Sequence, residues 1–419
     1  MRFDFVRIPT SSTSTTTSKT ICKNLDALRY RSELLFRGHS VERSGSAVWL
    51  FFVRFVGVEG PYSCLLIWRR SCYDNSMRKA QGTHEQTAHR RRTQSRFQER
   101  LETLGVSDDQ LDVSLREAGF IDPEFNDEPF RLLAAHLLSM KHVAVAYSGG
   151  VDSTFLLRVA WGLLGDRCLG VLAFSESLDR NELTDAKRVV EAIGAPYKII
   201  ETHEYDNPAY RVNNPDRCYH CKNELFDKAK AFAAARGIAY VLDGSNADDV
   251  GDYRPGLRAR DEHGVSSPLL EAGLDKAAIR HYSKILGLPT WDKPAAPCLS
   301  SRIPYGSEVT SEKLRQVERV ENDLRQLGFR VVRVRHHGDV ARVEIPAEDL
   351  PRFVSEANRQ RVVAAAKSAG FIYVAVDLEG FRSGSLNRTL TSESDGAAPA
   401  GRLIPVDALQ KLDSGGPSS

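Results

Sequence analysis

The sequence predicts an α/β protein, in which a doubly wound parallel sheet is followed by a smaller C-terminal α+β domain. An apolar run from Val143 to Tyr147 enters a Ser-Gly-Gly turn, and helical apolar spacing follows from Phe155 to Leu164. Strand-like and helix-like segments then alternate as far as Leu242. Such alternation indicates a parallel sheet that binds ligands at the carboxyl ends of its strands.

Hydrophobic periodicity gives each element a position along the chain. In the larger domain we expect a helix at Glu128–Met140, a strand from Val143, a strand at Leu169–Phe174, a helix at about Asn181–Ile193, a strand at Tyr197–Glu201, a helix at Lys222–Arg236 and a strand at Ala239–Leu242. In the smaller domain we expect a helix at Thr310–Leu327 capped near Ser311, strands at Arg330–Arg335 and Ala341–Ile345, a helix near Leu350–Ala369 and a strand at Ile372–Asp377.

Composition divides the 419 residues unevenly, because residues 1–100 carry 18 Lys and Arg against 8 Asp and Glu, and the remainder carries 39 against 47. We expect four parts: a basic low-complexity extension at 1–95, disordered or translated from upstream sequence with Met77 as the true start; the main domain at 127–305; the smaller domain at 306–390; and a disordered tail at 391–419. Seven irregularly spaced cysteines without a secretory signal favour a cytoplasmic protein with no membrane span.

The glycine turn is suited to holding phosphate. Helix N-termini present free backbone N–H groups, and glycines let an anion approach the main chain. The residues SGGVDS resemble the PP-loop of the ATP pyrophosphatase superfamily, whose adenine nucleotide alpha hydrolase-like fold binds ATP and Mg²⁺. The candidate ATP and Mg²⁺ residues are Ser148, Gly149, Gly150, Asp152 and Ser153, with Ser175, Gly244 and Asp248 after neighbouring strands. N-capping by Asp179, and a capped turn around Asp248, explain those two loops equally well.

Three cysteines form a second candidate site. Cys218 and Cys221 stand in a C-x-x-C between an Asn/Pro-rich loop and a helix, and Cys298 lies in a proline-stiffened loop. This set fits an iron–sulfur cluster with one open iron, or a redox pair plus a separate nucleophile, whereas structural zinc would need a fourth ligand. The other cysteines are expected to be bystanders, with Cys168 in the core.

Arg333 and Arg335 have a period of two and therefore share one face of the expected strand. Two guanidinium groups on one face could bind a phosphate bidentately, although a solvated basic strand is the alternative. The neighbouring His336 and His337 are expected to be structural.

Four further stretches are similar to the LarE family of ATP-dependent sulfur transferases. They are DGSNADDVGDYRPG, SPLLEAGLDKAAIRHYSKILGLPTWDKPAAPCLSSRIPYG, RVRHHGDVARVEI and DLEGFRSGSLN, within a match from Glu128 to Leu386. The resemblance implies adenylation of a carboxylate of pyridinium-3,5-biscarboxylic acid mononucleotide and its conversion to a thiocarboxylate, a step in nickel-pincer nucleotide synthesis for lactate racemase. It also implies that Arg333 and Arg335 lie at the substrate phosphate.

Two variants of that family differ in the source of sulfur. In one, a lone cysteine matching Cys298 gives up its own sulfur, and in the other, cysteines matching Cys218, Cys221 and Cys298 hold a [4Fe-4S] cluster. All three are present, so we expect the cluster type, with Cys218, Cys221 and Cys298 as the catalytic and metal-binding set. We also expect a homo-oligomer that works with a sulfur donor and other cofactor-maturation proteins. A PP-loop tRNA thiolase is the alternative. The body of the chain is net acidic, so no nucleic acid is expected to bind, and this disfavours the thiolase.

Overall fold

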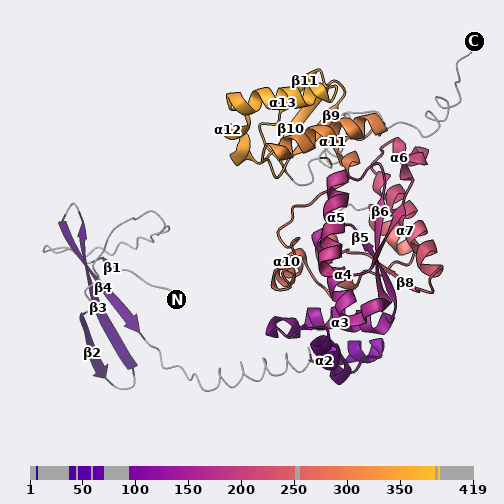
Figure 1. The fold of residues 1–419 in the computed structure, drawn as a ribbon. Coiled ribbons are helices and arrows are strands. Elements are labelled where there is room, and N and C mark those ends of the chain that lie inside the picture. Colours follow the sequence, from indigo (N-terminus) through magenta and orange to yellow (C-terminus); the bar gives the residue numbers. More distant parts are fainter. Residues whose placement is uncertain are drawn as a thin grey trace, which may run out of the picture. The chain divides into compact units, whose positions relative to one another are not determined.

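The computed structural model describes residues 6–7, 37–43, 46–57, 60–69, 94–250, 255–382 and 386. The chain divides into two compact units, Met1–Ser95 and Arg96–Ser419. In the first unit, β1 (Val6–Arg7), β2 (Arg37–Arg43), β3 (Ser46–Gly57) and β4 (Gly60–Arg69) pair antiparallel in the order β1-β4-β3-β2 (Figure 1). The sequence analysis expected no strands there. Most of residues 1–95, and all of 391–419, lie outside the described residues, so the expected disorder of both parts stays a prediction.

A four-stranded parallel sheet forms the centre of the second unit. Its strands are β5 (Val143–Tyr147), β6 (Cys168–Phe174), β7 (Tyr197–Glu201) and β8 (Tyr240–Leu242), in the order β7-β6-β5-β8. The helices of this part are α2 (Asp108–Glu117), α3 (Glu128–Met140), α4 (Val151–Leu164), α5 (Arg180–Ile193), α6 (Pro208–Arg211), α7 (Arg217–Ala234), α8 (Pro255–Glu262), α9 (Pro268–Glu271) and α10 (Lys276–Ile285).

Helices cover both faces of this sheet, as Figure 1 shows with α4 and α5 on one side and α7 on the other. Successive strand residues point to opposite faces. Val143 and Val145 accordingly pack with Phe155 of α4, whereas Ala144 packs with Phe226 of α7 in a separate apolar cluster. Because both of its faces are buried, β5 is a continuous apolar run, whereas the edge strand β7 is partly exposed and carries Lys198 and Glu201.

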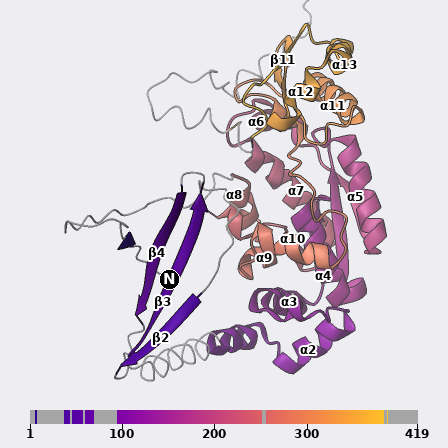
Figure 2. The same ribbon diagram turned by 90° about the vertical axis from the view of Figure 1, so that its left-hand side faces the viewer.

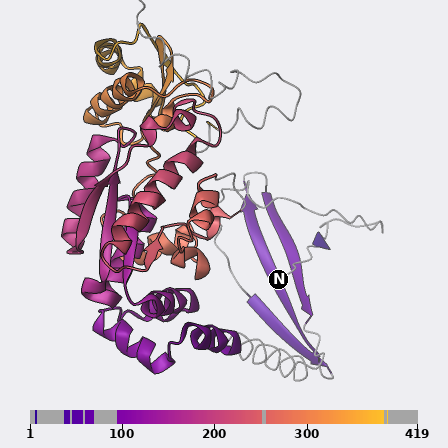
Figure 3. The same ribbon diagram turned by 90° about the vertical axis from the view of Figure 1, so that its right-hand side faces the viewer.

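A three-stranded sheet with its own core completes the unit. It consists of β9 (Arg333–His337), β10 (Val340–Glu344) and β11 (Tyr373–Val376) in the order β11-β10-β9, with α11 (Ser311–Gln326), α12 (Leu350–Phe353) and α13 (Glu356–Ser368). Figures 2 and 3 show these elements gathered at one end of the unit. Valines of β9 and β10 pack with apolar residues of α11 and α13, which explains why one face of each helix is apolar.

Most expected elements are confirmed, and three expectations are wrong. The helix expected at Lys222 begins at Arg217, so both cysteines of the C-x-x-C lie on α7 and not before it. The cap of α11 lies near Ser311 as expected, at Thr310, whose hydroxyl accepts from the Lys313 amide. The helix expected near 350–369 is two helices, because Ser355 is extended between them. The strand expected at 330–335 begins at Arg333.

Among the helices that the structure describes, none combines the length and apolarity of a membrane span. Cys168 is fully buried in the core as predicted, and burial raises the pKa of its thiol to about 12. The side chains of Cys22, Cys64 and Cys72 lie outside the described residues.

Candidate functional site

The turn that joins β5 to α4, together with the first turn of α4, is here called the glycine loop and comprises residues 148–154. The Ser153 hydroxyl accepts from the Ser148 amide at 3.2 Å and lies 3.1 Å from the Ser148 hydroxyl. Gly149 has a φ of 71°, in the region that favours glycine, and a Cβ there would lie 2.6 Å from the Cβ of Ala186 on α5. The loop therefore depends on glycine both for its backbone conformation and for its fit against α5.

The N-terminus of α4 has no capping side chain. Its N-cap is Gly150, whereas α3, α5, α10 and α11 each have an Asp or Thr side chain that accepts from an amide of the first turn. An uncapped first turn leaves backbone N–H groups directed at whatever lies beyond the helix end. Gly244, after β8, approaches the same turn so closely that a Cβ would lie 3.0 Å from the Ser153 amide nitrogen.

Two carboxylates predicted for ATP and Mg²⁺ differ in their surroundings. Asp152, in the first turn of α4, bonds to the Lys276 ammonium through Oδ2, and its Oδ1 is buried with no hydrogen-bond partner among the described residues. Asp248 accepts from the backbone amide of Lys276 at 2.9 Å, and Asn246 caps its short turn. Asp152 thus offers an unused oxygen, while the bonds of Asp248 agree with the capped-turn alternative.

The loop after β6 contacts the cysteine region more directly than it contacts the glycine loop. The Ser175 hydroxyl lies 2.9 Å from that of Ser177, which donates to Glu204 at 2.7 Å. The Ser177 carbonyl accepts from the Leu299 amide, next to Cys298, at 2.9 Å. Asp179 caps α5 as expected, and its other oxygen accepts from Arg325 at 2.6 Å.

The three predicted cysteines come from two segments that meet. Cys218 and Cys221 lie in the first turns of α7, and Cys298 precedes the short helix η5 (Leu299–Arg302). Burial raises the pKa of the Cys221 thiol well above its ordinary value, and Glu204, Cys298 and Cys218 raise it further. Coupling of this kind requires the groups to be near one another. Among the described residues, no three His, Cys, Asp or Glu side chains could hold a metal ion, so the cluster prediction stays a prediction.

Two polar residues, Asn213 and Arg217, hydrogen-bond the segment that follows Cys298 to the start of α7. Asn213 has a left-handed φ of 58° and is fully buried. The side-chain nitrogen Nδ2 of Asn213 donates to the carbonyls of Ile303, Pro304 and Ser307 at 3.2, 2.8 and 3.0 Å. Arg217 donates to the Asn213 side chain and, at 2.8 Å, to the carbonyl of Ser300.

Arg217 is itself an unusual group, because it is 2% exposed and has no carboxylate partner among the described residues. Burial alone would lower the pKa of its guanidinium, but the Cys298 and Cys218 thiols raise it above the ordinary value. A buried charge is stable only beside groups that compensate it. The buried guanidinium of Arg217 therefore offers a positive charge to a group bound beside Cys218 and Cys298.

A second network holds the loop at residues 295–302, here called the cysteine loop. Arg302 donates to the carbonyl of Cys298 at 3.0 Å and pairs bidentately with Glu321 at 2.8 and 2.9 Å. Glu321 is fully buried and also accepts from Arg325 at 2.9 Å. Burial would raise the pKa of Glu321, but Arg302 and Arg325 lower it below its ordinary value.

The arginines predicted for a phosphate also contact the cysteine loop. Arg333 donates to the carbonyl of Ala295, and burial, with Arg302 beside it, lowers the pKa of its guanidinium to about 10. Arg335 donates to the carbonyl of Ser301 at 2.9 Å and pairs with Glu344 at 2.7 Å. The solvated-strand alternative is wrong, since both side chains are buried.

One lysine connects the two candidate sites. Lys293, which precedes Cys298 by five residues, donates from Nζ to the carbonyl of Gly149 at 3.2 Å and pairs with Glu182 at 2.7 Å. Lys293, like Lys276, Glu204 and Arg217, is not among the site residues predicted from the sequence. No motif marks these residues, although an Asn such as Asn213 before Asn-Pro favours a left-handed turn.

Comparison with known proteins finds relatives that match about three-fifths of the chain or less. Pyridinium-3,5-bisthiocarboxylic acid mononucleotide synthase of Lactiplantibacillus plantarum is 41% identical over 62% of this chain and 94% of its own length. An uncharacterized protein of Synechocystis is 48% identical over 59% of this chain and 92% of its own. One component of the glutamine-hydrolysing GMP synthase of Thermoplasma volcanium is 32% identical over 41% of this chain and 59% of its own. No protein-family model matches the chain.

Proposed function

The chain belongs to the LarE family, the family of pyridinium-3,5-bisthiocarboxylic acid mononucleotide synthase, and we propose that it is an ATP-dependent, AMP-forming sulfurtransferase acting on a carboxylate of that pyridinium nucleotide. The observation that carries the proposal is the bond from Lys293 to Gly149, which ties the segment bearing Cys298 to the glycine loop. Activation by a nucleotide and transfer of sulfur need to occur at one place, and this contact supports that requirement.

The proposed fold is the doubly wound PP-loop fold, and the strand order β7-β6-β5-β8 with helices on both faces supports it. We further propose the domain limits 127–305 and 306–390 within the second unit.

In the first half-reaction, the glycine loop would hold the triphosphate of ATP. The uncapped amides of α4, with Ser148, Ser153 and the backbone of Gly244, stabilise charge that builds on pyrophosphate as the substrate carboxylate attacks the α-phosphorus. Asp152 Oδ1, which has no hydrogen-bond partner among the described residues, would bind Mg²⁺, an ion that prefers oxygen ligands. The products are pyrophosphate and an acyl adenylate, whose AMP is a good leaving group.

In the second half-reaction, sulfur would replace AMP at the acyl carbon. Cys218, Cys221 and Cys298 would hold a [4Fe-4S] cluster, and such a cluster supplies a sulfur atom for transfer. The three thiol donors do not converge on the position of a single metal ion, and what supports the cluster is that their two segments meet beside Arg217, whose buried charge suits an anionic group beside Cys298. Arg333 and Arg335 are proposed for the substrate phosphate, which would have to compete with the carbonyls and the Glu344 carboxylate that they contact.

The test is an anaerobic assay of the full chain with ATP and the pyridinium nucleotide. We expect AMP, pyrophosphate and thiocarboxylate in equal amounts, several per chain when sulfide is supplied, and iron bound in proportion to active protein. Cys298→Ala, Cys218→Ala and Cys221→Ala should each abolish thiocarboxylate, whereas Cys168→Ala, which changes a core cysteine, should retain it. Absence of ATP-dependent thiocarboxylate from the wild type would disprove the proposal, and a single turnover leaving dehydroalanine at Cys298 would replace the cluster by the single-use cysteine.

A further inference from the structure

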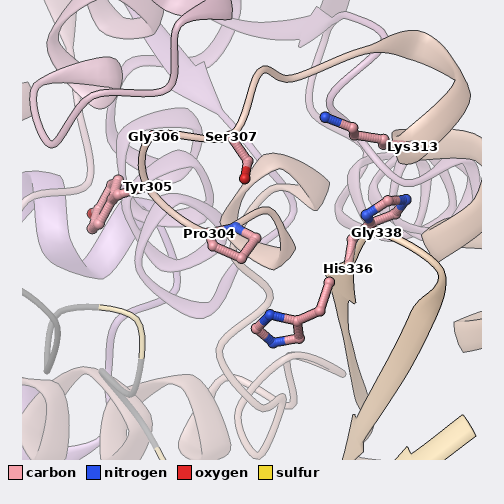
Figure 4. Close-up of a pocket in the computed structure, with 8 residues that line it drawn as sticks. Pro304, Tyr305, Gly306, Ser307, Lys313, His336 and Gly338 are labelled. Carbon is pink, nitrogen blue, oxygen red and sulfur yellow. The ribbon is translucent and has the colours of Figure 1, made fainter. Parts of the chain in front are cut away.

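A pocket of about 370 Å³ lies apart from the glycine loop and the cysteines. The turn after η5, the first turn of α11 and the end of β9 form it, and its lining residues are Pro304, Tyr305, Gly306, Ser307, Lys313, His336, His337 and Gly338. Figure 4 shows Ser307, Lys313 and His336 arranged around one space. None of the eight lining residues is acidic, so the polar side chains facing this space are a hydroxyl, a phenol, an ammonium and two imidazoles.

Two carboxylates near the pocket pair with arginines, and the exposed Glu312, next to Lys313, does not line the pocket. Glu308, beside the lining turn, pairs with Arg211 at 2.9 Å, and the Lys313 ammonium contacts only its backbone carbonyl, at 2.6 Å. Glu344, across from β9, pairs with Arg335 and Arg342. The positive charge of the pocket is thus not neutralised by an ion pair with Lys313 among the described residues.

Burial disfavours the charged form of each basic group of the pocket, and neighbouring cations add to this at the two histidines. Burial lowers the pKa of Lys313, burial and then Lys313 lower that of His336, and burial and then Arg342 lower that of His337. A bound anion would relieve both the burial and the repulsion.

Lys313 and His337 each have a hydrogen to donate, whereas Nε2 of His336 lies 2.9 Å from the side-chain oxygen of Gln316 and uses the proton of its neutral ring there. An ammonium has three, and Lys313 uses one for the Glu308 carbonyl. His337 accepts from Arg342 at Nε2, at 3.2 Å, which places the proton of the neutral ring on Nδ1. Hydrogen-bond donors from three elements therefore surround a space that no acidic side chain lines. An oxyanion prefers such surroundings.

We propose that this pocket binds the phosphate group of a small molecule, at a site separate from the glycine loop and from Arg333 and Arg335. Its volume lies within the range of about 300–1,000 Å³ typical of small-molecule sites, so it accommodates more than a bare phosphate. Asn213 bonds the carbonyls of Pro304 and Ser307, so a ligand on this turn is one side chain away from Arg217.

The first test measures acylation of individual lysines in the full chain by mass spectrometry, with and without pyrophosphate at constant ionic strength. Pyrophosphate should slow acylation of Lys313 by about threefold or more through direct contact, and leave unchanged that of Lys367, an exposed lysine of α13 that does not line the pocket. Lys276 and Lys293 report binding at the glycine loop. Protection of those two lysines without protection of Lys313 would overturn the proposal, as would equal slowing of every lysine.

The second test is calorimetric titration with phosphate, pyrophosphate and AMP. Lys313→Gln should weaken one binding event roughly tenfold, the loss expected for one charge-assisted hydrogen bond, whereas Lys367→Gln, the same charge change on α13, should not. Ser307→Ala, a milder substitution, should weaken the same event if Lys313→Gln fails to fold. Tighter binding of AMP than of phosphate would identify a nucleotide phosphate, and equal binding a free oxyanion. Unchanged affinities in both variants would overturn the proposal.

Discussion

The glycine loop and the cysteine loop lie on one unit but are built in opposite ways. Ser148, Gly150 and Ser153 bond to one another within six residues, and two distant lysines, Lys276 and Lys293, add bonds to Asp152 and Gly149. The cysteine loop is instead held by side chains that lie up to 83 residues before it and 38 residues after it, namely Arg217, Arg333, Arg335 and the Arg302–Glu321 pair. The first loop therefore depends mainly on bonds between its own residues, whereas a change far from Cys298 can move the second.

The largest effect should come from Glu321→Gln. Removing the carboxylate leaves the buried Arg302 without its ion-pair partner, while Arg325 keeps Asp179, and this costs about 3–5 kcal/mol of unfolding free energy. Because folding lowers the pKa of Glu321 below its unfolded value near 4.5, its contribution is present above that pH and is lost as the pH falls through the folded-state pKa. Urea unfolding of both proteins between pH 7 and pH 3 should therefore show the variant with the weaker dependence on pH.

The matched change is Glu312→Gln, an exposed residue at the start of the same helix. It should alter the unfolding free energy by less than about 0.5 kcal/mol. Equal losses in the two variants would mean that the cysteine loop does not depend on the buried network.

Gly149→Ala should have the next largest effect. It tests whether the glycine loop depends mainly on its own residues. The strain of a positive φ and the overlap with Ala186 together cost about 3 kcal/mol. Gly105→Ala separates the two causes, because Gly105 has a similar φ of 66° and nothing within 4 Å of a new Cβ. Thermal unfolding should show Gly105→Ala losing only about 1–2 kcal/mol. ATP binding should weaken in Gly149→Ala alone.

Asn213→Gly keeps the left-handed backbone and removes only the side chain. Three carbonyls and Arg217 lose a partner, so we expect a loss of about 2 kcal/mol in unfolding free energy. Bound iron per chain should fall while ATP affinity, measured by calorimetry, stays unchanged. A fall in ATP affinity of the same size would contradict the separation of the two loops.

The smallest effect is expected for Gly244→Ala. A Cβ there meets the Ser153 amide at 3.0 Å and the Asp152 Cβ at 3.3 Å, and φ is not positive. The neighbouring turn has to shift by a few tenths of an ångström, which costs about 1 kcal/mol. The Michaelis constant for ATP should rise with little loss of thermal stability, and an unchanged constant would place Gly244 outside the nucleotide site.

The sequence by itself determined the parallel sheet, helix α3 to the residue, and the glycine loop between β5 and α4. Periodicity, caps and glycines act between residues a few positions apart, so they can be read along the chain. The start of α7 at Arg217, the pinning of the cysteine loop by Asn213 and the carboxylate partner of Arg335 were decided only by the tertiary structure. Those contacts satisfy buried charges and buried carbonyls from segments up to about a hundred residues apart, and no local pattern records which distant group will arrive.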